Sequence, residues 1–488
     1  MYADDAALFV RPTVRDITNV RHLLQIFGKA TGLMTNIQKS ELYHIRCEGI
    51  NQTDLNDAFQ GRVAEFPCKY LGLPLHIGRT RRADEQILID KIGARLPGWK
   101  GRLLNRAGRL TLVNSVLSSI PVYHMTSFPL SKWAIKRIDR IRRNFLWKGA
   151  DDARKGTYLV NWRRVNRAKS LGGLGVKDLT CFNRALRLRW KWLHWAEPSR
   201  PWTGMSISMA AEEEELFKAC TVISIGNGVR TNFWKDRWLK GQAPKDIAPE
   251  CFRWAWRKNI TVAKALTNRC WMRGLRRMNN ETALRQFVEL WTQIQQIRLS
   301  SHPDQITWRF TSDGQYIVKS AYEMQFCGSY ADHIWKKIWG AKAENKCRFF
   351  CWLMLQDRLP TADRIIRRGG QTNHICQLCH IREESILHMI ATCSFSKSVW
   401  TKIAMDYSLQ PLQDPGHMTL RSWRQSWVDR GRAESNKHLQ VLIYTVWNLW
   451  KERCRRVFDN KAMSQVQLTA IIKSDITNYS LAHRNDEV

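Results

Sequence analysis

The sequence predicts an α+β protein that is mostly α-helical. Apolar residues recur at helical spacing through residues 105–120 and 132–148, and the chain after residue 330 is mostly helical in pattern. Short β-like runs flank Asn227-Gly228, and Asp313-Gly314 lies in a similar setting, which indicates two hairpins. With 488 residues, 44% of them apolar, the chain is long enough for about two to four domains with sizeable cores.

Residues 1–80 are expected to contain two hairpins and a helix. The first hairpin turns at Asp4-Asp5, the helix lies near 14–31, and the second hairpin lies around 68–75. Two adjacent aspartates on a straight strand would face opposite ways, whereas at a tight hairpin tip both can approach the same ions. Mg²⁺ prefers such carboxylate oxygens.

Residues 81–200 form a strongly basic helical region. They contain 27 Lys+Arg and 8 Asp+Glu, a net charge of +19. A helix is expected after the plausible N-cap Asn105, with Pro121 ending it. Its apolar stripe is expected to consist of Leu110, Val113, Leu117 and Ile120. The glycines at 172, 173 and 175 lack the spacing of known phosphate-binding loops and predict a tight turn before a basic, Trp-rich helix.

The segment 132–148 separates apolar from basic positions. An apolar stripe is expected to bury one side of the helix, and basic residues fall largely on the remaining surface. A merely solvated helix face is the alternative, but the region has too few acidic partners to resemble a surface laced with ion pairs. We therefore expect contacts with phosphates, which are independent of base sequence and sensitive to salt. The stripe is Ala134, Ile138, Ile141 and Phe145, and the basic residues are Lys136, Arg137, Arg140 and Arg143.

An acidic run at 212–215 marks the boundary to a second region at 201–330, which contains the two predicted hairpins. Residues 256–300 between them look helical and polar. The chain has 23 tryptophans, and most are expected to be packing anchors, such as Trp234 with Trp238 and Trp335 with Trp339. A few could instead stack on unpaired bases.

The composition of the whole chain indicates a polyanionic partner. The formal net charge is +35, from 78 Lys+Arg and 43 Asp+Glu, so RNA and/or DNA is the default partner. No apolar stretch approaches the ~20 residues needed to span a membrane, and no small-molecule cofactor is apparent. The N-terminus lacks the pattern of a signal peptide. Thirteen cysteines are too sparse for a disulfide scaffold, which favours reduced thiols in a nuclear or cytoplasmic protein.

A metal-binding pattern lies at 376–393. Cys376 and Cys379 form a CxxC pair, and His388 and Cys393 follow at compact spacing. Three thiolates and one imidazole are the ligands of a closed, structural zinc site. The alternative is a set of buried thiols with a core histidine. His374 and His380 are spare candidates, whereas Cys347 and Cys351 have apolar neighbours that favour a core role.

Several motifs in fixed order resemble the reverse transcriptases of plant LINE-type, non-LTR retrotransposons over essentially the whole chain. "YADD" matches their catalytic hairpin, and "GKATGLMTNIQKSELY" is similar to the next palm element, with Gly32, Leu33, Asn36, Lys39 and Ser40 at the family's positions. "FPCKYLGLPL" resembles the primer-grip hairpin, and "LPGWKGRLLNRAGRLTLVNSVLSSIPVY" resembles the thumb. "IGNGVRTNFWKDRWL" and "GQYIVKSAY" are similar to the connecting region. Residues 335–400 resemble the reverse-transcriptase zinc-binding domain.

This resemblance implies a domain organisation. Residues 1–80 would be a partial palm, 81–200 a basic helical thumb and its extension, and 201–330 a connecting region with β-hairpins. Residues 331–460 would be the zinc-binding domain, and 461–488 a C-terminal helix or tail. The chain would then be the C-terminal portion of an RNA-directed DNA polymerase.

The resemblance also assigns roles to residues. Asp4 and Asp5 would be catalytic and would bind Mg²⁺ weakly, because the family has a further aspartate, the fingers and the nucleotide pocket upstream. We therefore expect Mg²⁺ to matter only if the complete polymerase site is assembled, and the chain to be inactive alone. The alternatives are a non-catalytic, zinc-containing nucleic-acid-binding protein or a decayed retroelement reading frame. The residues expected to contact nucleic acid are Tyr2, Lys39, Arg106, Arg109, Lys136, Arg137, Arg140 and Arg143.

Overall fold

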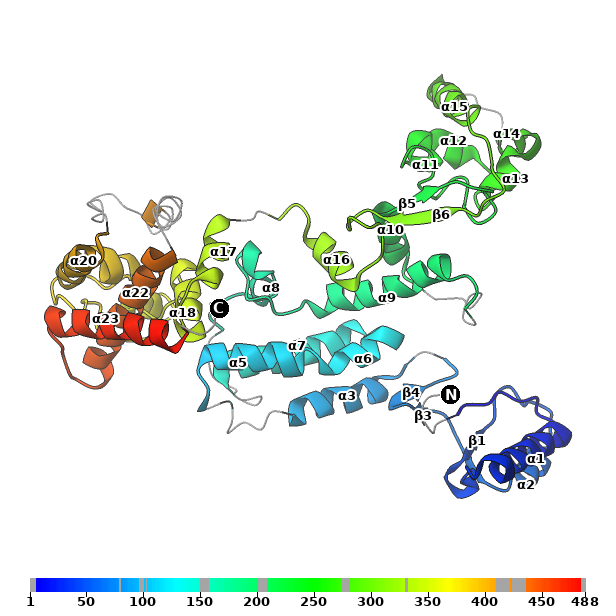
Figure 1. Ribbon diagram of the computed structural model, residues 1–488, viewed down its shortest axis with the longest axis horizontal. Helices are drawn as coiled ribbons and strands as arrows, with labels where there is room; N and C mark the ends of the chain where they lie inside the picture. The colour runs from blue at the N-terminus through cyan, green and yellow to red at the C-terminus, as the bar shows by residue number, and fades with distance from the viewer. Residues whose placement is uncertain are drawn as a thin grey trace. The chain divides into compact units, whose positions relative to one another are not determined.

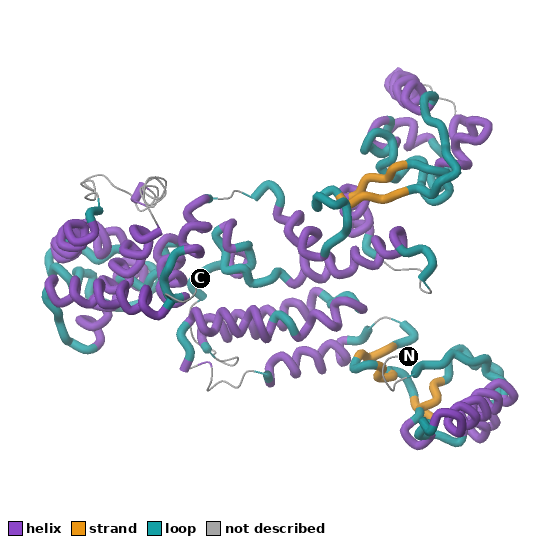
Figure 2. The backbone as a smooth tube through the Cα atoms, in the orientation of Figure 1, coloured by secondary structure: helices purple, strands orange, loops and turns teal. Residues whose placement is uncertain are grey.

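Helices make up most of the structure, and the strands that it describes form three two-stranded pairs (Figures 1 and 2). The computed structural model describes residues 6–78, 80–95, 101, 103–149, 158–200, 209–273, 275, 281–329, 332–409, 422–423 and 436–483. The chain divides into two compact units, Met1–Ala94 and Arg95–Val488. The predicted fold class, a mostly helical α+β protein, is confirmed.

The first unit combines three helices with two strand pairs. The predicted helix is α1, which begins where the Thr13 side chain accepts the backbone N–H of Asp16 and ends at Gly32, whose φ is 76°. The predicted hairpin is the antiparallel pair β3–β4, whereas the parallel pair β1–β2 was not predicted. The Asp4-Asp5 hairpin lies outside the described residues. The elements are α1 (Val14–Thr31), a 3-10 turn (Ile37–Lys39), β1 (Glu41–Tyr43), α2 (Gln52–Phe59), β2 (Arg62–Ala64), β3 (Cys68–Tyr70), β4 (Leu73–Leu75) and α3 (Arg82–Ala94).

The second unit is built mainly from helices. Its first half contains α5 (Arg106–Leu112), a π-helical turn (Val113–Leu117), α6 (Ile120–Ser127), α7 (Lys132–Lys148), α8 (Trp162–Val165), a 3-10 turn (Lys169–Leu171), α9 (Leu179–Ala196), α10 (Ala211–Cys220) and β5 (Thr221–Ser224). Then follow α11 (Pro244–Ile247), α12 (Pro249–Trp254), α13 (Val262–Leu266), a 3-10 turn (Thr267–Arg269), α14 (Cys270–Arg273), α15 (Glu281–Ile294), β6 (Gln305–Trp308), α16 (Val318–Glu323) and a 3-10 turn (Met324–Phe326).

The C-terminal part of this unit carries the zinc-type pattern. Its elements are α17 (His333–Gly340), α18 (Asn345–Leu355), α19 (Ala362–Ile366), a π-helical turn (His388–Thr392), α20 (Ser394–Tyr407), α22 (Asn436–Phe458) and α23 (Gln465–Ala482). Helices α22 and α23 pack against each other, and α18 packs against both α22 and α5. The Trp352 indole and the Gln356 amide of the α18 region both donate to the carbonyl of Gly172, at 2.9 and 3.1 Å.

The helix expected at 105–120 differs from its prediction at the C-terminal end. Asn105 is the N-cap, since its side chain accepts the N–H of Gly108. Pro121 does not end a helix but lies in the first turn of α6. A proline is tolerated there because the first N–H groups of a helix have no intrahelical partner. The π-helical turn Val113–Leu117 links α5 to α6, and the backbone stays in the right-handed helical region at Leu112, Ser118 and Ser119.

Helix α7 buries the predicted side. Ala134, Ile138 and Phe145 are buried and Ile141 is half-buried. The Ser131 hydroxyl caps the N-terminus, and Gly149 ends the helix with φ 78°. Arg142 lies between the predicted basic positions and is fully buried. Its guanidinium donates hydrogen bonds to the Asp139 carboxylate and to the carbonyl of Lys177.

The prediction of two hairpins in the connecting region is wrong, because the strand beside the first turn pairs with a distant strand. Both turns exist, with Gly228 at φ 68° and Gly314 at φ 69°, but β5 pairs antiparallel with β6. Thr221 lies opposite Trp308, so the strands meet across more than 80 residues. The residues of a turn indicate where the chain reverses, but they do not determine which two strands pair.

The turn at Gly228 is held by the buried carboxylate of Asp304. It accepts backbone N–H groups of Gly226 at 2.9 Å, Gly228 at 2.7 Å and Thr231 at 3.2 Å, and the Thr231 hydroxyl at 2.7 Å. Burial raises the pKa of Asp304, but the hydrogen bonds from the Thr231 hydroxyl and the backbone amides outweigh it and hold the pKa below its usual value. This contact joins the turn to the segment that precedes β6.

We expect Asp304→Ala to destabilise this turn by about 3 kcal/mol, because it leaves several buried donors without an acceptor. Hydrogen exchange of the amides of residues 226–231 measures the effect. Since the folded pKa is lowered, the carboxylate stabilises the fold fully above the unfolded value of about 3.9 and loses that contribution as pH falls through the folded value. Asp304→Asn should lack this acid-dependent loss, and equal exchange rates in all three proteins would contradict the assignment.

Most tryptophans in the described part of the chain are buried or half-buried packing anchors, as predicted. Trp234, Trp238 and Trp271 share one core with Phe233, and Trp335 is also buried. Cys347 and Cys351 are fully buried on α18, which confirms their predicted core role.

Candidate metal centre

The four residues of the predicted zinc site converge. Each of Cys376, Cys379, His388 and Cys393 offers one ligand atom, and these atoms all lie within 4.8 Å of one another. Cys376 and Cys393 have no exposed surface, and His388 is 7% exposed. The spare candidates His374 and His380 are exposed and do not belong to this group.

A tight loop presents the first two cysteines. The backbone N–H of Cys376 donates to the carbonyl of Arg382, and that of His380 donates to the carbonyl of Cys376, both at 2.8 Å. His380 has a positive φ of 56°, and Ile375 pairs with Glu383 in an isolated antiparallel bridge. The chain therefore folds back on itself, and both thiols of the CxxC pair reach the same point.

The π-helical turn presents the other two ligands. The N–H of Cys393 donates to the carbonyl of His388 at 2.8 Å, which closes the turn and places both side chains on the cluster. His388 Nε2 lies 3.3 Å from Cys379 Sγ, while Nδ1 lies 3.1 Å from the Thr392 hydroxyl. In the tautomer that leaves Nε2 free for a metal, Nδ1–H donates to Thr392, which fixes the ring as is usual for histidine ligands.

Local hydrogen bonds favour thiolates at two of the cysteines. The Cys376 thiol and then the backbone N–H groups of Ser396 and Phe395 lower the pKa of Cys393, which immediately precedes α20. Burial raises the pKa of Cys379, but the N–H groups of Arg382 and Ile381 outweigh it, so the pKa is lowered. These two positions therefore favour the thiolate that metal binding requires, whereas the hydrogen bond with Cys393 and burial raise the pKa of Cys376 to about 12.

The donor set fits zinc of the structural kind. Three sulfurs and one imidazole nitrogen fill a tetrahedral coordination sphere. Among the described residues, no fifth His, Cys, Asp or Glu joins this group. Glu384, the nearest buried carboxylate in sequence, is engaged by Arg453 instead. The arrangement therefore leaves no coordination position for a substrate.

The chain is similar in sequence to known proteins, and one of these similarities covers the metal centre. Residues 316–400 match the family described as zinc-binding in reverse transcriptase. The chain is 26% identical over 410 residues to an Arabidopsis thaliana protein named as a ribonuclease H protein, covering 76% of this chain. It spans 64% of the length of that relative. An uncharacterised mitochondrial protein of Arabidopsis thaliana is 27% identical over 154 residues, 26% of this chain and 96% of that protein. These likenesses support a reverse-transcriptase-related protein.

Helix α22, which lies outside the residues 316–400 that match the family, contributes two arginines that bind the zinc-binding region. The guanidinium of Arg453 donates to both carboxylate oxygens of Glu384, at 3.1 and 2.8 Å, and the two side chains are 4% and 1% exposed. Glu384 also accepts the N–H of Ala362 at 2.8 Å. Arg456 donates to the carbonyls of Gln377 and Leu378, inside the CxxC loop, at 3.1 and 3.0 Å.

The contacts of Arg453 and Arg456 with the zinc-binding region were not predicted from the sequence. The i, i+4 spacing of Glu452 and Arg456 on α22 was visible and predicts a helical ion pair, which forms at 2.8 Å. Nothing in that spacing shows that Arg456 also reaches the loop between Cys376 and Cys379.

The residues predicted to contact nucleic acid have different surroundings. Lys136, Arg137 and Arg140 are exposed on α7, and in the part of the chain that the structure describes none of them makes an ion pair with an acidic side chain. Arg143 is half-buried, with its guanidinium carbon 4.6 Å from the centroid of the Tyr158 ring. The first three are therefore exposed cations that no acidic side chain neutralises, and their contact with phosphates stays a prediction.

Four further candidates lie elsewhere. Arg106 is exposed on α5, whereas Arg109 Nε donates to the carbonyl of Gly101 at 2.7 Å. Lys39 is exposed in the first unit. Tyr2, together with Asp4 and Asp5, lies outside the described residues. Nucleic-acid contact by all of these residues stays a prediction.

None of the helices among the described residues has both the length and the apolar character needed to cross a bilayer.

Proposed function

We propose that this chain is a nucleic-acid-binding protein derived from the reverse transcriptase of a plant LINE-type, non-LTR retrotransposon, and that it holds one structural zinc ion. The observation that carries the proposal is the buried cluster of three thiols and one imidazole within the region that matches the zinc-binding family. Its motifs and its positive charge agree with this assignment.

The partner is RNA and/or DNA, bound through phosphates. Lys136, Arg137 and Arg140 stand on an exposed helix face in a region of net charge +19, and their charges are not neutralised by acidic neighbours. Binding through such residues releases counterions and does not depend on base sequence. The zinc ion has no open coordination position, so its role is to fix the fold and not to activate a substrate.

Asp4 and Asp5 are the catalytic part of this proposal. They would supply two carboxylates to the metal site of an RNA-directed DNA polymerase, in which two divalent ions activate the primer hydroxyl and clamp the triphosphate. Two carboxylates bind Mg²⁺ weakly, because this ion relies on substrate phosphates as well. We place the protein in the nucleus or cytoplasm, where its thiols stay reduced.

Replacing Lys136 and Arg140 with Ala should weaken binding to unrelated sequences about equally. It should also reduce the slope of log affinity against log salt concentration by about one unit for each phosphate that the variant no longer neutralises. Titrations of a labelled oligonucleotide at several salt concentrations measure both quantities.

Arg285→Ala is the matched control, because this exposed arginine on α15 already pairs with Glu281 at 3.2 Å. Its slope should equal that of the unmodified protein. An unchanged slope in the Lys136 and Arg140 variant would assign these residues to solvent or to a protein partner. No binding of any nucleic acid at low salt would refute the proposed function.

A further inference from the structure

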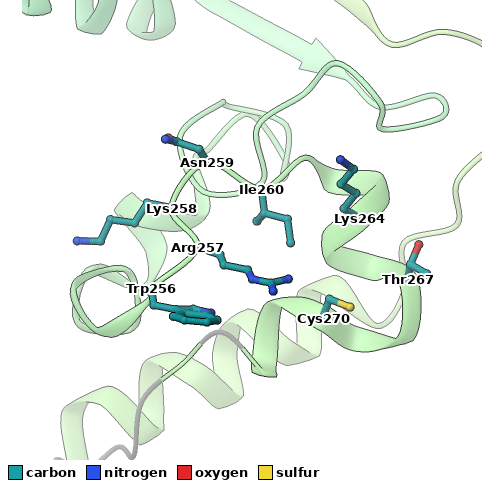
Figure 3. Close-up of a pocket in the computed structure, with 8 residues that line it drawn as sticks. All are labelled: Trp256, Arg257, Lys258, Asn259, Ile260, Lys264, Thr267 and Cys270. Carbon is teal, nitrogen blue, oxygen red and sulfur yellow. The ribbon is translucent and has the colours of Figure 1, made fainter.

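An open hollow lies in the second unit, and the segment from the end of α12 to α14 lines it. Its volume is about 610 Å³, and it is an open surface depression and not an enclosed cavity. It combines an aromatic side chain with three cations and contains no acidic residue. The lining residues are Trp256, Arg257, Lys258, Asn259, Ile260, Lys264, Thr267 and Cys270 (Figure 3).

Trp256 differs from the other tryptophans of the described chain. It is 67% exposed, whereas every other tryptophan in the described ranges is buried or half-buried. Trp234 and Trp271, in a buried core of the same unit, are 1% and 2% exposed. An indole held in water at the edge of a hollow offers a large apolar ring face to a ligand.

The charged residues that line the hollow are all cationic. Residues 251–275 contain six cations and no Asp or Glu. Figure 3 shows the Arg257 guanidinium pointing toward the middle of the lining residues, whereas Lys258 points away from them. The guanidinium carbon lies 5.4 Å from the centroid of the Trp256 ring. Arg257 therefore lies over one face of the ring within cation–π range, while the indole as a whole stays 67% exposed.

The backbone that carries these side chains is tied to a buried core. The N–H of Phe233 donates to the carbonyl of Ile260 at 2.9 Å, and the Asn232 amide donates to the carbonyl of Lys258 at 3.4 Å. Thr261 pairs with Asn232 in an isolated bridge. The loop between α12 and α13 is therefore fixed at both Lys258 and Ile260, which holds the aromatic and cationic groups near one another.

We propose that this hollow binds one nucleotide of a single-stranded nucleic acid. The base stacks on the exposed face of Trp256, and the adjacent phosphates lie against Arg257 and Lys264. A base inside a duplex already has both faces stacked, so the combination of a free ring and cations selects unpaired nucleotides. This inference rests on the proposed nucleic-acid binding but places it at a second, strand-selective site.

The test uses the full chain with zinc bound and a labelled single-stranded oligonucleotide of about 12 nucleotides, within the size that one such site and its surroundings cover. Trp256→Ala should weaken binding about 5- to 100-fold, the loss expected when one base–aromatic stack is removed. Trp256→Phe should recover most of the affinity. Phe458→Ala, which removes an aromatic side chain that is 75% exposed on α22, should leave affinity unchanged.

Photocrosslinking locates the strand. An oligonucleotide with photoreactive bases should crosslink to the peptide that contains Trp256, and the yield should fall in Arg257→Ala with Lys264→Ala. A duplex of the same sequence should bind with equal affinity to the unmodified protein and to Trp256→Ala. A free mononucleotide should compete only weakly.

The outcomes separate this inference from the proposed function. If the strand binds but crosslinks only within residues 81–200, and Trp256→Ala is without effect, the site is refuted and the proposed function stands. If neither strand nor duplex binds, both fail. Saturation of the hollow by a mononucleotide, with no gain for the oligonucleotide, would refute the assignment to a strand.

Discussion

Removing zinc should unfold the region around Cys376–Cys393 and leave helices α5 to α7 intact. The segment from Arg364 to Ser385 is polar and arginine-rich, so it has little apolar surface of its own to bury. Metal binding would then supply much of its folding free energy, on the order of 10 kcal/mol as in zinc-finger peptides. Hydrogen exchange before and after chelation should show reduced protection in residues 374–400 and unchanged protection in α7.

A serine substitution provides the covalent version of this experiment. Cys376→Ser should lower zinc content from one ion per chain and reduce thermal stability, because it removes a buried ligand. Cys327→Ser is the matched control, since Cys327 is exposed and lies outside the cluster. Purified protein without zinc, together with unchanged stability in Cys376→Ser, would return the four residues to the alternative of buried thiols around a core histidine.

Glu384→Ala should destabilise the zinc-binding region by about 3–5 kcal/mol, because it strands a buried guanidinium without its counter-ion. Arg453 is 4% exposed and donates two hydrogen bonds to this carboxylate. The same change removes the acceptor for the N–H of Ala362. Thermal unfolding and the rate of zinc transfer to a chelator should both report the loss.

The neighbouring residue gives a sharp control. Glu383 is exposed, so Glu383→Ala should change stability by only a few tenths of a kcal/mol. Replacing Glu384 and Arg453 together with apolar residues of similar volume should cost less than Glu384→Ala alone, since no unpaired charge remains buried. A double variant at least as unstable as the single one would contradict the assignment of the loss to Arg453.

Features encoded by local chemistry could be predicted from the sequence. Helix α1, the Asn105 cap and the β3–β4 hairpin follow from side chains within a few residues of one another. The convergence of the four metal-site residues followed from spacing, because a short loop and one helical turn bring the ligands together without any distant segment.

Features that depend on distant segments could not be predicted. The β5–β6 pair joins strands more than 80 residues apart in the sequence. The residues around Asn227 and Asp313 do not indicate which strand pairs with which. In the sequence, Glu384 is one charged residue in a polar stretch, and nothing near it indicates that Arg453 of α22 pairs with it. The exposure of individual tryptophans could not be predicted either. Trp234 and Trp256 each follow an apolar residue and precede a basic one, but they are 1% and 67% exposed.

Helix α18 limits how the protein can be divided for experiments. From Phe349 to Leu355 every side chain is buried, with Phe349 facing Trp147 of α7 and Phe350 facing Trp447 of α22. A helix that is apolar all round needs cover on every side. A recombinant fragment that begins after residue 330 would keep the zinc ligands and α22 but lose α5 and α7, and so would present a bare apolar flank to solvent. Such a fragment should self-associate, and the smallest soluble piece that carries the metal centre should begin upstream of α5.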